Sequence, residues 1–84
     1  MEIRYSPKFI RQYKKLPEEI KGRLEKREII FCKNPFDPRL KTHKLHGSQS
    51  AFMAFSVDYS YRIIFKLYGN EAVFYEIGTH DIYE

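Results

Sequence analysis

The chain opens on a short alternation of apolar and polar residues, which predicts a β-strand. Ile3 and Tyr5 alternate with Glu2 and Arg4. A period of two places successive side chains on opposite faces of a strand. The period changes at Ser6, so the strand is expected to end there.

Two helices are predicted next, separated by Pro17. Ser6 is a favourable N-cap, and Pro7 fits the first helical position because that position needs no N–H donor. The second helix is expected to end near Lys33, since the residue before Pro35 avoids the α conformation. The apolar residues at helical spacing are Phe9, Ile10, Tyr13 and Leu16 in the first helix and Ile20, Leu24, Ile30 and Phe31 in the second.

Residues 34–50 lack a clear period. They contain two prolines, two histidines and a cluster of bases. Long irregular segments in compact domains are frequently functional. The alternative is a solvated connector, with a short strand around Leu40–Leu45.

The remainder of the chain alternates again and predicts antiparallel strands. They cover residues 52–57, 61–68 and 72–79, with turns at 58–60 and 69–70. The order β-α-α-β-β-β predicts an α+β fold, in which a helical hairpin packs on one face of a small, mainly antiparallel twisted sheet. The opposite face of this sheet is then open to a ligand.

Composition and charge fit one domain over residues 1–84 with an anionic partner. The chain is 43% hydrophobic and 17% aromatic, which is typical of a folded globule. Fifteen Lys and Arg against eleven acids give a formal charge of +4. This excess favours binding to nucleic acid or to an acidic protein, although a basic protein without such a partner is the alternative. Between residues 33 and 50 the bases face Asp37 as the one acid.

The compartment is expected to be the cytoplasm. Cys32 is the one cysteine, so no internal disulfide can form. No apolar run approaches the roughly twenty residues that cross a bilayer, and the first residues do not resemble a secretion signal. We therefore expect no membrane partner.

The familiar cofactor and metal motifs are absent from the sequence. It has no glycine-rich phosphate loop, no CxxC pair and no nucleophile elbow. His43 and His46 have a spacing that a metal could use, but a zinc site needs about four ligands and Cys32 is distant in the sequence. We expect neither a metal nor a small-molecule cofactor.

The histidines and one arginine instead suggest RNA cleavage without a metal. Such a reaction needs a base for the 2′-hydroxyl proton, a cation beside the phosphate and an acid for the leaving oxygen. His43 and His80 titrate near neutrality and can exchange protons, and Arg62 can bind phosphate oxygens in a forked geometry. Taken singly, each residue is more often a solvated surface side chain, and only their joint presence makes the two interpretations about equal.

Several aromatic residues could stack on an unpaired base, although packing in the core or at its rim is the more common role for any one of them. They are Phe52, Tyr68, Tyr75 and Tyr83. Tyr83 is the strongest candidate for a functional ring because it is close to the end of the chain.

Three segments in this order resemble the RelE/ParE toxin superfamily, and in particular its RelE, YafQ and YoeB-like branch. They are Lys44-Leu45-His46-Gly47, the strand pair around residues 55–57 and 61–65, and Ile77-Gly78-Thr79-His80-Asp81. The resemblance covers nearly the whole chain. It implies a microbial toxin of a type II toxin–antitoxin system, which a co-encoded antitoxin protein binds and blocks. Ribonuclease members of the family cut messenger RNA on the ribosome by 2′-hydroxyl attack, without a metal.

The resemblance also implies roles for individual residues. His43 and His80 match histidines that YafQ-like members use in catalysis, and Arg62 matches an arginine placed against the scissile phosphate. Tyr83 lies near a C-terminal aromatic of several members. The residues expected to bind RNA around this site are Arg39, Lys41, Lys44, His46 and Lys66.

The sequence departs from the family pattern at three positions between residues 54 and 60. Ala54 and Ser56 stand where relatives often have basic residues, Ser56 also replaces a YafQ-like catalytic histidine, and Ser60 replaces an acid. Phosphate-binding charge is therefore reduced, and cleavage is expected to be slow or to depend on the ribosome for alignment.

Three functions follow from the resemblance. The first is a ribosome-dependent messenger-RNA endoribonuclease with an antitoxin, the ribosome and messenger RNA as partners. The second is a ParE-like inhibitor that binds DNA gyrase without catalysis, which the histidine-rich site disfavours. The third is a degenerate toxin that binds only its antitoxin. The fold is common to all three and does not choose between them.

Overall fold

The structure is a computed structural model that describes residues 1–47 and 50–79. The elements are β1 (Glu2–Tyr5), α1 (Pro7–Lys14), α2 (Glu18–Lys33), the short 3₁₀ helix η1 (Pro38–Leu40), β2 (His43–Lys44), β3 (Met53–Ser56), β4 (Arg62–Tyr68) and β5 (Glu71–Gly78). The predicted strands and helices are confirmed to within one or two residues. The short strand considered around Leu40–Leu45 is β2, preceded by η1.

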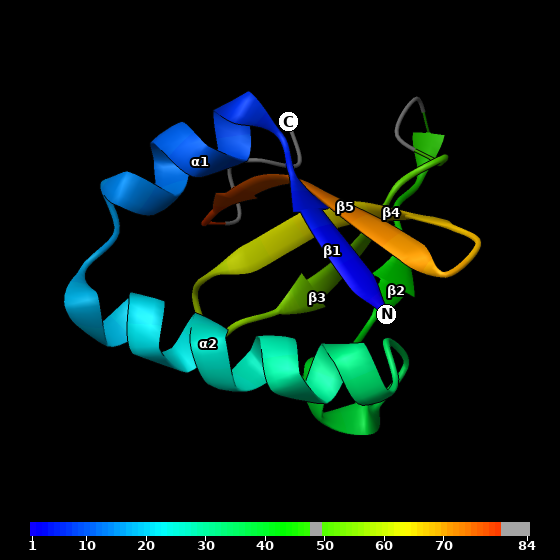
Figure 1. The fold of residues 1–84 in the computed structure, drawn as a ribbon, viewed down its shortest axis with the longest axis horizontal. Coiled ribbons are helices and arrows are strands. Elements are labelled where there is room, and N and C mark those ends of the chain that lie inside the picture. Colours follow the sequence, from blue (N-terminus) through cyan, green and yellow to red (C-terminus); the bar gives the residue numbers. More distant parts are fainter. Residues whose placement is uncertain (48–49, 80–84) are drawn as a thin grey trace.

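The strands form one five-stranded sheet in the order β1-β5-β4-β3-β2 (Figure 1). β1 pairs with β5 in parallel, and every other neighbouring pair is antiparallel. The predicted α+β fold with a mainly antiparallel sheet is thus confirmed. The parallel pair arises because both helices lie between β1 and the rest of the sheet in the sequence, which gives the chain the length to return in the same direction.

The helix boundaries are set by the residues that the sequence suggested. The Ser6 hydroxyl accepts a hydrogen bond from the Phe9 N–H at 3.0 Å and donates one to the Tyr75 carbonyl at 2.8 Å. One side chain therefore caps α1 and fixes its start to β5. α2 begins directly after Pro17 and ends at Lys33, before Pro35.

The main core lies between the helices and one face of the sheet, which we call the inner face. Four phenylalanines form its centre: Phe31 of α2, Phe55 of β3, Phe65 of β4 and Phe74 of β5, each fully buried. The Phe31 ring lies 5.0–5.2 Å from the other three, centroid to centroid. The Phe31 ring stacks on Phe55 and meets Phe65 and Phe74 edge to face, and aromatic contacts of both kinds add stability beyond that of the buried area.

The opposite, outer face of the sheet carries a smaller apolar cluster. Leu45, Ala54 and Ile64 are buried there, and Phe52 packs against them. Phe65 pairs with Phe74 whereas Ile64 pairs with Glu76, so Tyr75 is the extra residue of a β-bulge. Outside this cluster, the outer face presents the polar and aromatic side chains of β4 and β5.

Candidate functional site

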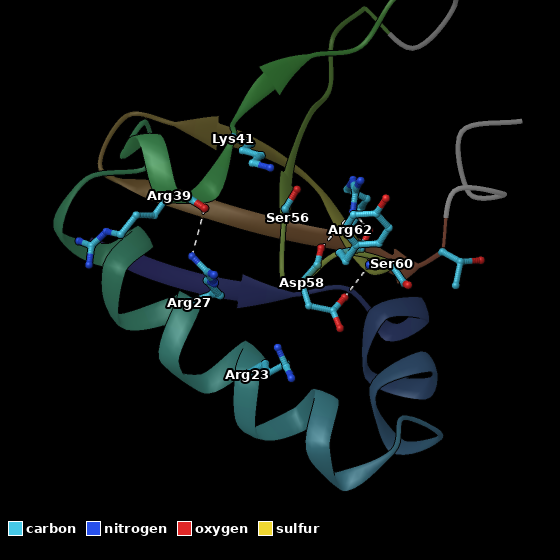
Figure 2. A pocket seen from close by; sticks show the side chains of 10 residues that line it. Arg23, Arg27, Arg39, Lys41, Ser56, Asp58, Ser60 and Arg62 are labelled. Carbon is cyan, nitrogen blue, oxygen red and sulfur yellow. Dashed lines mark hydrogen bonds between the residues drawn. The ribbon is translucent and has the colours of Figure 1, made fainter.

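A basic cleft of about 750 Å³ opens at one end of the sheet, where residues of α2, of the η1 region and of the β3–β4 turn come together. Among the described residues that line it, five are basic and Asp58 is the one acid. Figure 2 shows the side chains from α2, from the segment after η1 and from the β3–β4 region around this space. The five bases are Arg23, Arg27, Arg39, Lys41 and Arg62. This arrangement favours an anion, because like charges around a concave surface reinforce one another's field.

Arg62 is held in place by the turn that precedes β4. Its Nη1 atom donates to the carbonyls of Asp58 and Tyr59, both at 3.2 Å, and of Tyr61 at 3.4 Å. The Asp58 carboxylate closes this turn by accepting from the N–H groups of Ser60 at 2.9 Å and Tyr61 at 2.8 Å. One edge of the guanidinium is thus fixed to the backbone, and its Nε and Nη2 atoms are the donors left for a ligand.

Arg23 and Arg27 form the helix side of the cleft, and sequence reasoning missed both. They lie one turn apart on α2 and therefore point the same way. Arg23 pairs with Glu19 at 3.0 Å in an exposed contact of little energetic weight. The Nη1 atom of Arg27 donates to the Arg39 carbonyl at 3.0 Å, which joins α2 to the segment that leads to β2.

Arg39 lines the cleft, but its guanidinium is paired with a neighbour. Nε and Nη2 donate to the two carboxylate oxygens of Asp37 at 3.0 and 2.9 Å. Hydrogen bonds from the Arg39 side chain and backbone lower the pKa of Asp37 to about 2, so this pair stays charged at neutral pH. In Figure 2 the Arg39 side chain extends away from Arg62.

Lys41 enters the cleft through an unusual backbone conformation. Its φ of 54° and ψ of 40° lie in the left-handed region, which is uncommon for a residue with a side chain. This conformation ends η1 and turns the chain into β2. The backbone of Lys41 is therefore strained, and the side chain of this strained residue lines the cleft.

His43 and Lys44 lie on different sides of β2. His43 pairs with Ala54, which in turn pairs with Ile64, so it shares the outer face with Arg62. The register places the two Cα atoms about 12 Å apart, two strands across and two residues along. The His43 Nδ1 atom lies 3.0 Å from the Lys41 carbonyl. Lys44 pairs with Met53 and so takes the inner-face side of the strand.

Lys66 lies outside the cleft, among aromatic rings on the outer face. Its Nζ atom is 4.3 Å from the centroid of Phe52 and 6.0 Å from that of Tyr75. His46 is exposed and follows the buried Leu45. The structure thus brings Arg39, Lys41 and Arg62 to the cleft, and leaves His43, Lys44, His46 and Lys66 out of its lining.

Two predicted site residues, His80 and Tyr83, lie outside the described residues. Thr79 is the last described residue and lines the cleft. Within residues 1–47 and 50–79, no three His, Cys, Asp or Glu side chains gather as metal ligands. None of the helices in those ranges has the length and apolar character to cross a membrane.

The three departures from the family pattern have different surroundings. Ala54 is fully buried beneath the outer face, so the cluster around it leaves no space for a long basic side chain. Ser56 and Ser60 both line the cleft. The two positions at which the resemblance implies a catalytic and an acidic group thus line the cleft and carry short hydroxyl side chains in this chain.

Comparisons with known proteins find the same fold in solved toxin structures. No protein-family model and no curated protein matches the sequence. YafQ from Escherichia coli BL21(DE3) superposes with a TM-score of 0.80 at 22% identity, over 96% of this chain and 94% of that one. The YoeB/ParE toxin from Agrobacterium tumefaciens gives 0.80 at 12% identity, over 95% and 99%. The toxin in the E. coli DinJ–YafQ toxin–antitoxin complex gives 0.78 at 22% identity, over 96% and 93%. This chain therefore has the fold of the RelE/ParE toxin superfamily.

Proposed function

We propose that the protein is the toxin of a toxin–antitoxin system and a metal-independent endoribonuclease that cuts messenger RNA on the ribosome. The observation that carries this proposal is the basic cleft, in which Arg62 is fixed by three backbone carbonyls beside an opening to the outer face. A fixed guanidinium with two donors left for a ligand suits a phosphate whose charge increases in the transition state.

In the proposed reaction a base removes the proton of a 2′-hydroxyl, and O2′ attacks the adjacent phosphorus. The O2′–P bond forms and the P–O5′ bond breaks, while an acid donates a proton to O5′. The products are a 2′,3′-cyclic phosphate and a 5′-hydroxyl. Arg62 stabilises the negative charge of the phosphorane. Lys41 and the α2 arginines bind the flanking backbone.

The histidines take the proton-transfer roles. His80 follows Thr79 of the cleft lining in the sequence and is assigned as the acid or the base. His43 is the second proton-transfer or positioning group. Tyr83 is assigned a supporting role at the site.

The partner that we propose is a small co-encoded antitoxin. The YafQ relative is solved in a complex with DinJ, which supports this assignment. A basic toxin of this kind suits an acidic or amphipathic segment that orders on binding. A neighbouring reading frame whose product co-purifies with this chain is the expected result, and an isolated reading frame contradicts it.

The test is a cleavage assay with translating ribosomes, in which message ends are mapped for the wild type, Arg62→Gln and His80→Ala. We expect both variants to cut at least about 100-fold more slowly, as is typical when a charge-stabilising or proton-transfer group is lost. Arg62→Lys keeps the charge but not the fork and should fall between. Lys33→Gln, which removes a charge outside the cleft, is the matched control and should cut normally.

Equal cleavage by all four variants would contradict the assignment of the site. Gyrase inhibition by a wild-type protein that cuts no RNA would instead support the ParE-like alternative. Thermal unfolding of Arg62→Gln is measured in parallel, because Arg62 also holds the 58–61 turn.

A further inference from the structure

The outer face of the sheet carries a second cluster of side chains, which the cleft does not include. We call it the aromatic platform and define it as Phe52, Lys66, Tyr68 and Tyr75. The rings of Phe52 and Tyr75 meet edge to face, with centroids 5.4 Å apart. The hydroxyls of Tyr68 and Tyr75 are 2.8 Å apart, and Tyr68 is about half exposed.

We infer that this platform binds an unpaired nucleobase of the RNA whose backbone occupies the cleft. The inference rests on the proposed function, because it assumes that the ligand is single-stranded RNA. Aromatic rings beside a cation are a surface on which bases of any identity stack. In the unbound protein Lys66 lies over the Phe52 ring at 4.3 Å.

The charges of this face favour RNA over an acidic or apolar protein segment. The two acids of β5 on the outer face are already paired, Glu76 with Lys8 at 2.8 Å and Glu71 with Arg4 at 3.1 Å. None of the ion pairs within the described ranges includes Lys66 or Arg62. The outer face therefore presents a net positive charge to a ligand. The charge comes from Arg62 and Lys66, which lie at the two ends of the outer-face row of β4.

The spacing along β4 also suits an extended strand of RNA. Arg62, Ile64 and Lys66 alternate on the outer face, so the guanidinium and the ammonium are four residues apart on one strand. At the rise of a β-strand, this separation is about 13 Å between Cα atoms. Ile64, between them on the strand, is buried, and the partly buried Phe52 packs against it. A backbone phosphate at Arg62 and a base stacked beside Lys66 can thus belong to one short segment of RNA.

The aromatic platform packs on buried residues on one side and is partly exposed on the other. Phe52 packs on Leu45, Ala54 and Ile64, which are buried. The bulge in β5 brings Tyr75 to the same side as Glu76, where both line a shallow depression with Phe52 and Ile64. Rings that are fixed in this way lose little conformational freedom when a base stacks on them.

The experiment measures binding of a short single-stranded RNA and of the same strand with abasic riboses, by fluorescence anisotropy. The proteins are the wild type, Phe52→Leu, Tyr75→Leu and Phe36→Leu. Leucine keeps the apolar bulk and removes the ring, and Phe36 is an exposed phenylalanine outside the linings of the cleft and of the depression. Thermal unfolding confirms that each variant is folded.

We expect removal of the bases to weaken wild-type and Phe36→Leu binding by about five- to 100-fold, the range for stacked bases. For Phe52→Leu the same change of RNA should matter less than about threefold, because the ring that the base contacts is already absent. Tyr75→Leu should show a similar loss of coupling, so the inference does not depend on one variant.

Equal sensitivity to the bases in Phe52→Leu, Tyr75→Leu and wild type would overturn the inference, and so would equal binding of both RNAs by every protein. A wild type that binds neither RNA would also overturn it. The ribosome assay tests the proposed function separately. Message cleavage that is lost in Arg62→Gln would support that function whether or not the platform stacks a base.

Discussion

The two faces of the sheet are built from the same strands but differ in burial and in the side chains that they present. The inner face buries Phe55, Phe65 and Phe74 against Phe31 of α2, and these four rings are fully buried. The outer face has a small buried cluster and then presents Arg62, Lys66 and partly exposed aromatic rings. Within β4, alternate residues therefore point into the main core and toward the outer face.

This difference separates stability from binding. Substitutions on the inner face should unfold the protein, whereas substitutions on the outer face should change ligand binding with little loss of stability.

The largest effect is expected from Phe74→Ala on the inner face. Phe74 is fully buried, and removal of a buried phenylalanine leaves a cavity that costs about 3–5 kcal/mol of unfolding free energy. Urea denaturation measures this change. Tyr68→Ala, on the outer face of the same hairpin, is the control and should cost less than about 1 kcal/mol. Similar losses for both variants would contradict the separation of the faces.

A smaller, pH-dependent effect is expected from Tyr5→Phe at the margin of the inner face. The Tyr5 hydroxyl donates to both oxygens of Glu28 at 3.0 and 3.1 Å. Burial raises the pKa of Glu28, and the hydrogen bond from Tyr5 opposes that rise. The variant should therefore be less stable than the wild type by about 0.5–1 kcal/mol near neutral pH.

The sign of the pH dependence follows from the loss of this hydrogen bond. Without the hydroxyl, the pKa of Glu28 rises further, so the variant binds the proton more tightly than the wild type. The stability difference is then fully present above the Glu28 pKa of the variant and shrinks as the pH falls through it. Urea denaturation at about pH 7 and about pH 4 measures it, and a difference that grows at the lower pH would refute the assignment.

The smallest effect is expected from Asp37→Asn at the cleft. The change removes the carboxylate that binds Arg39, so the guanidinium becomes available to a phosphate. Binding of single-stranded RNA should tighten by a few-fold at low salt, and the slope of log K against log salt should steepen by up to about 0.7. Asp37→Asn combined with Arg39→Gln is the control and should lose the gain. An unchanged slope would mean that Arg39 does not reach the ligand.

Much of the fold could be predicted because each element has its own local pattern. The alternation of Arg62, Ile64 and Lys66 places them on one face of β4, as the structure confirms. Ser6 and Pro7 locate the start of α1 to the residue. These patterns involve only residues that are close together in the sequence, so they can be recognised without the structure.

The composition of the cleft could not be predicted in the same way, because it depends on how the elements meet. Arg23 and Arg27 have the pattern of a solvated helix face, with Glu19 one turn before Arg23, and the sequence does not say that the sheet end lies opposite. The sequence predicts that Arg39 binds RNA, but its guanidinium forms an ion pair with Asp37, two residues away. The Asp-Pro-Arg sequence is the signal that could have indicated this pair.

Attack by a 2′-hydroxyl at the cleft can be tested with one modified substrate. A message that carries a single 2′-deoxyribose at the mapped cut position is presented on ribosomes beside the unmodified message, in the presence of EDTA-washed protein. Attack by the 2′-hydroxyl predicts that the unmodified message is cut to a 2′,3′-cyclic phosphate and a 5′-hydroxyl, and that the deoxy position is not cut at all. Cleavage at the deoxy position, or a product with a 5′-phosphate, would contradict the account.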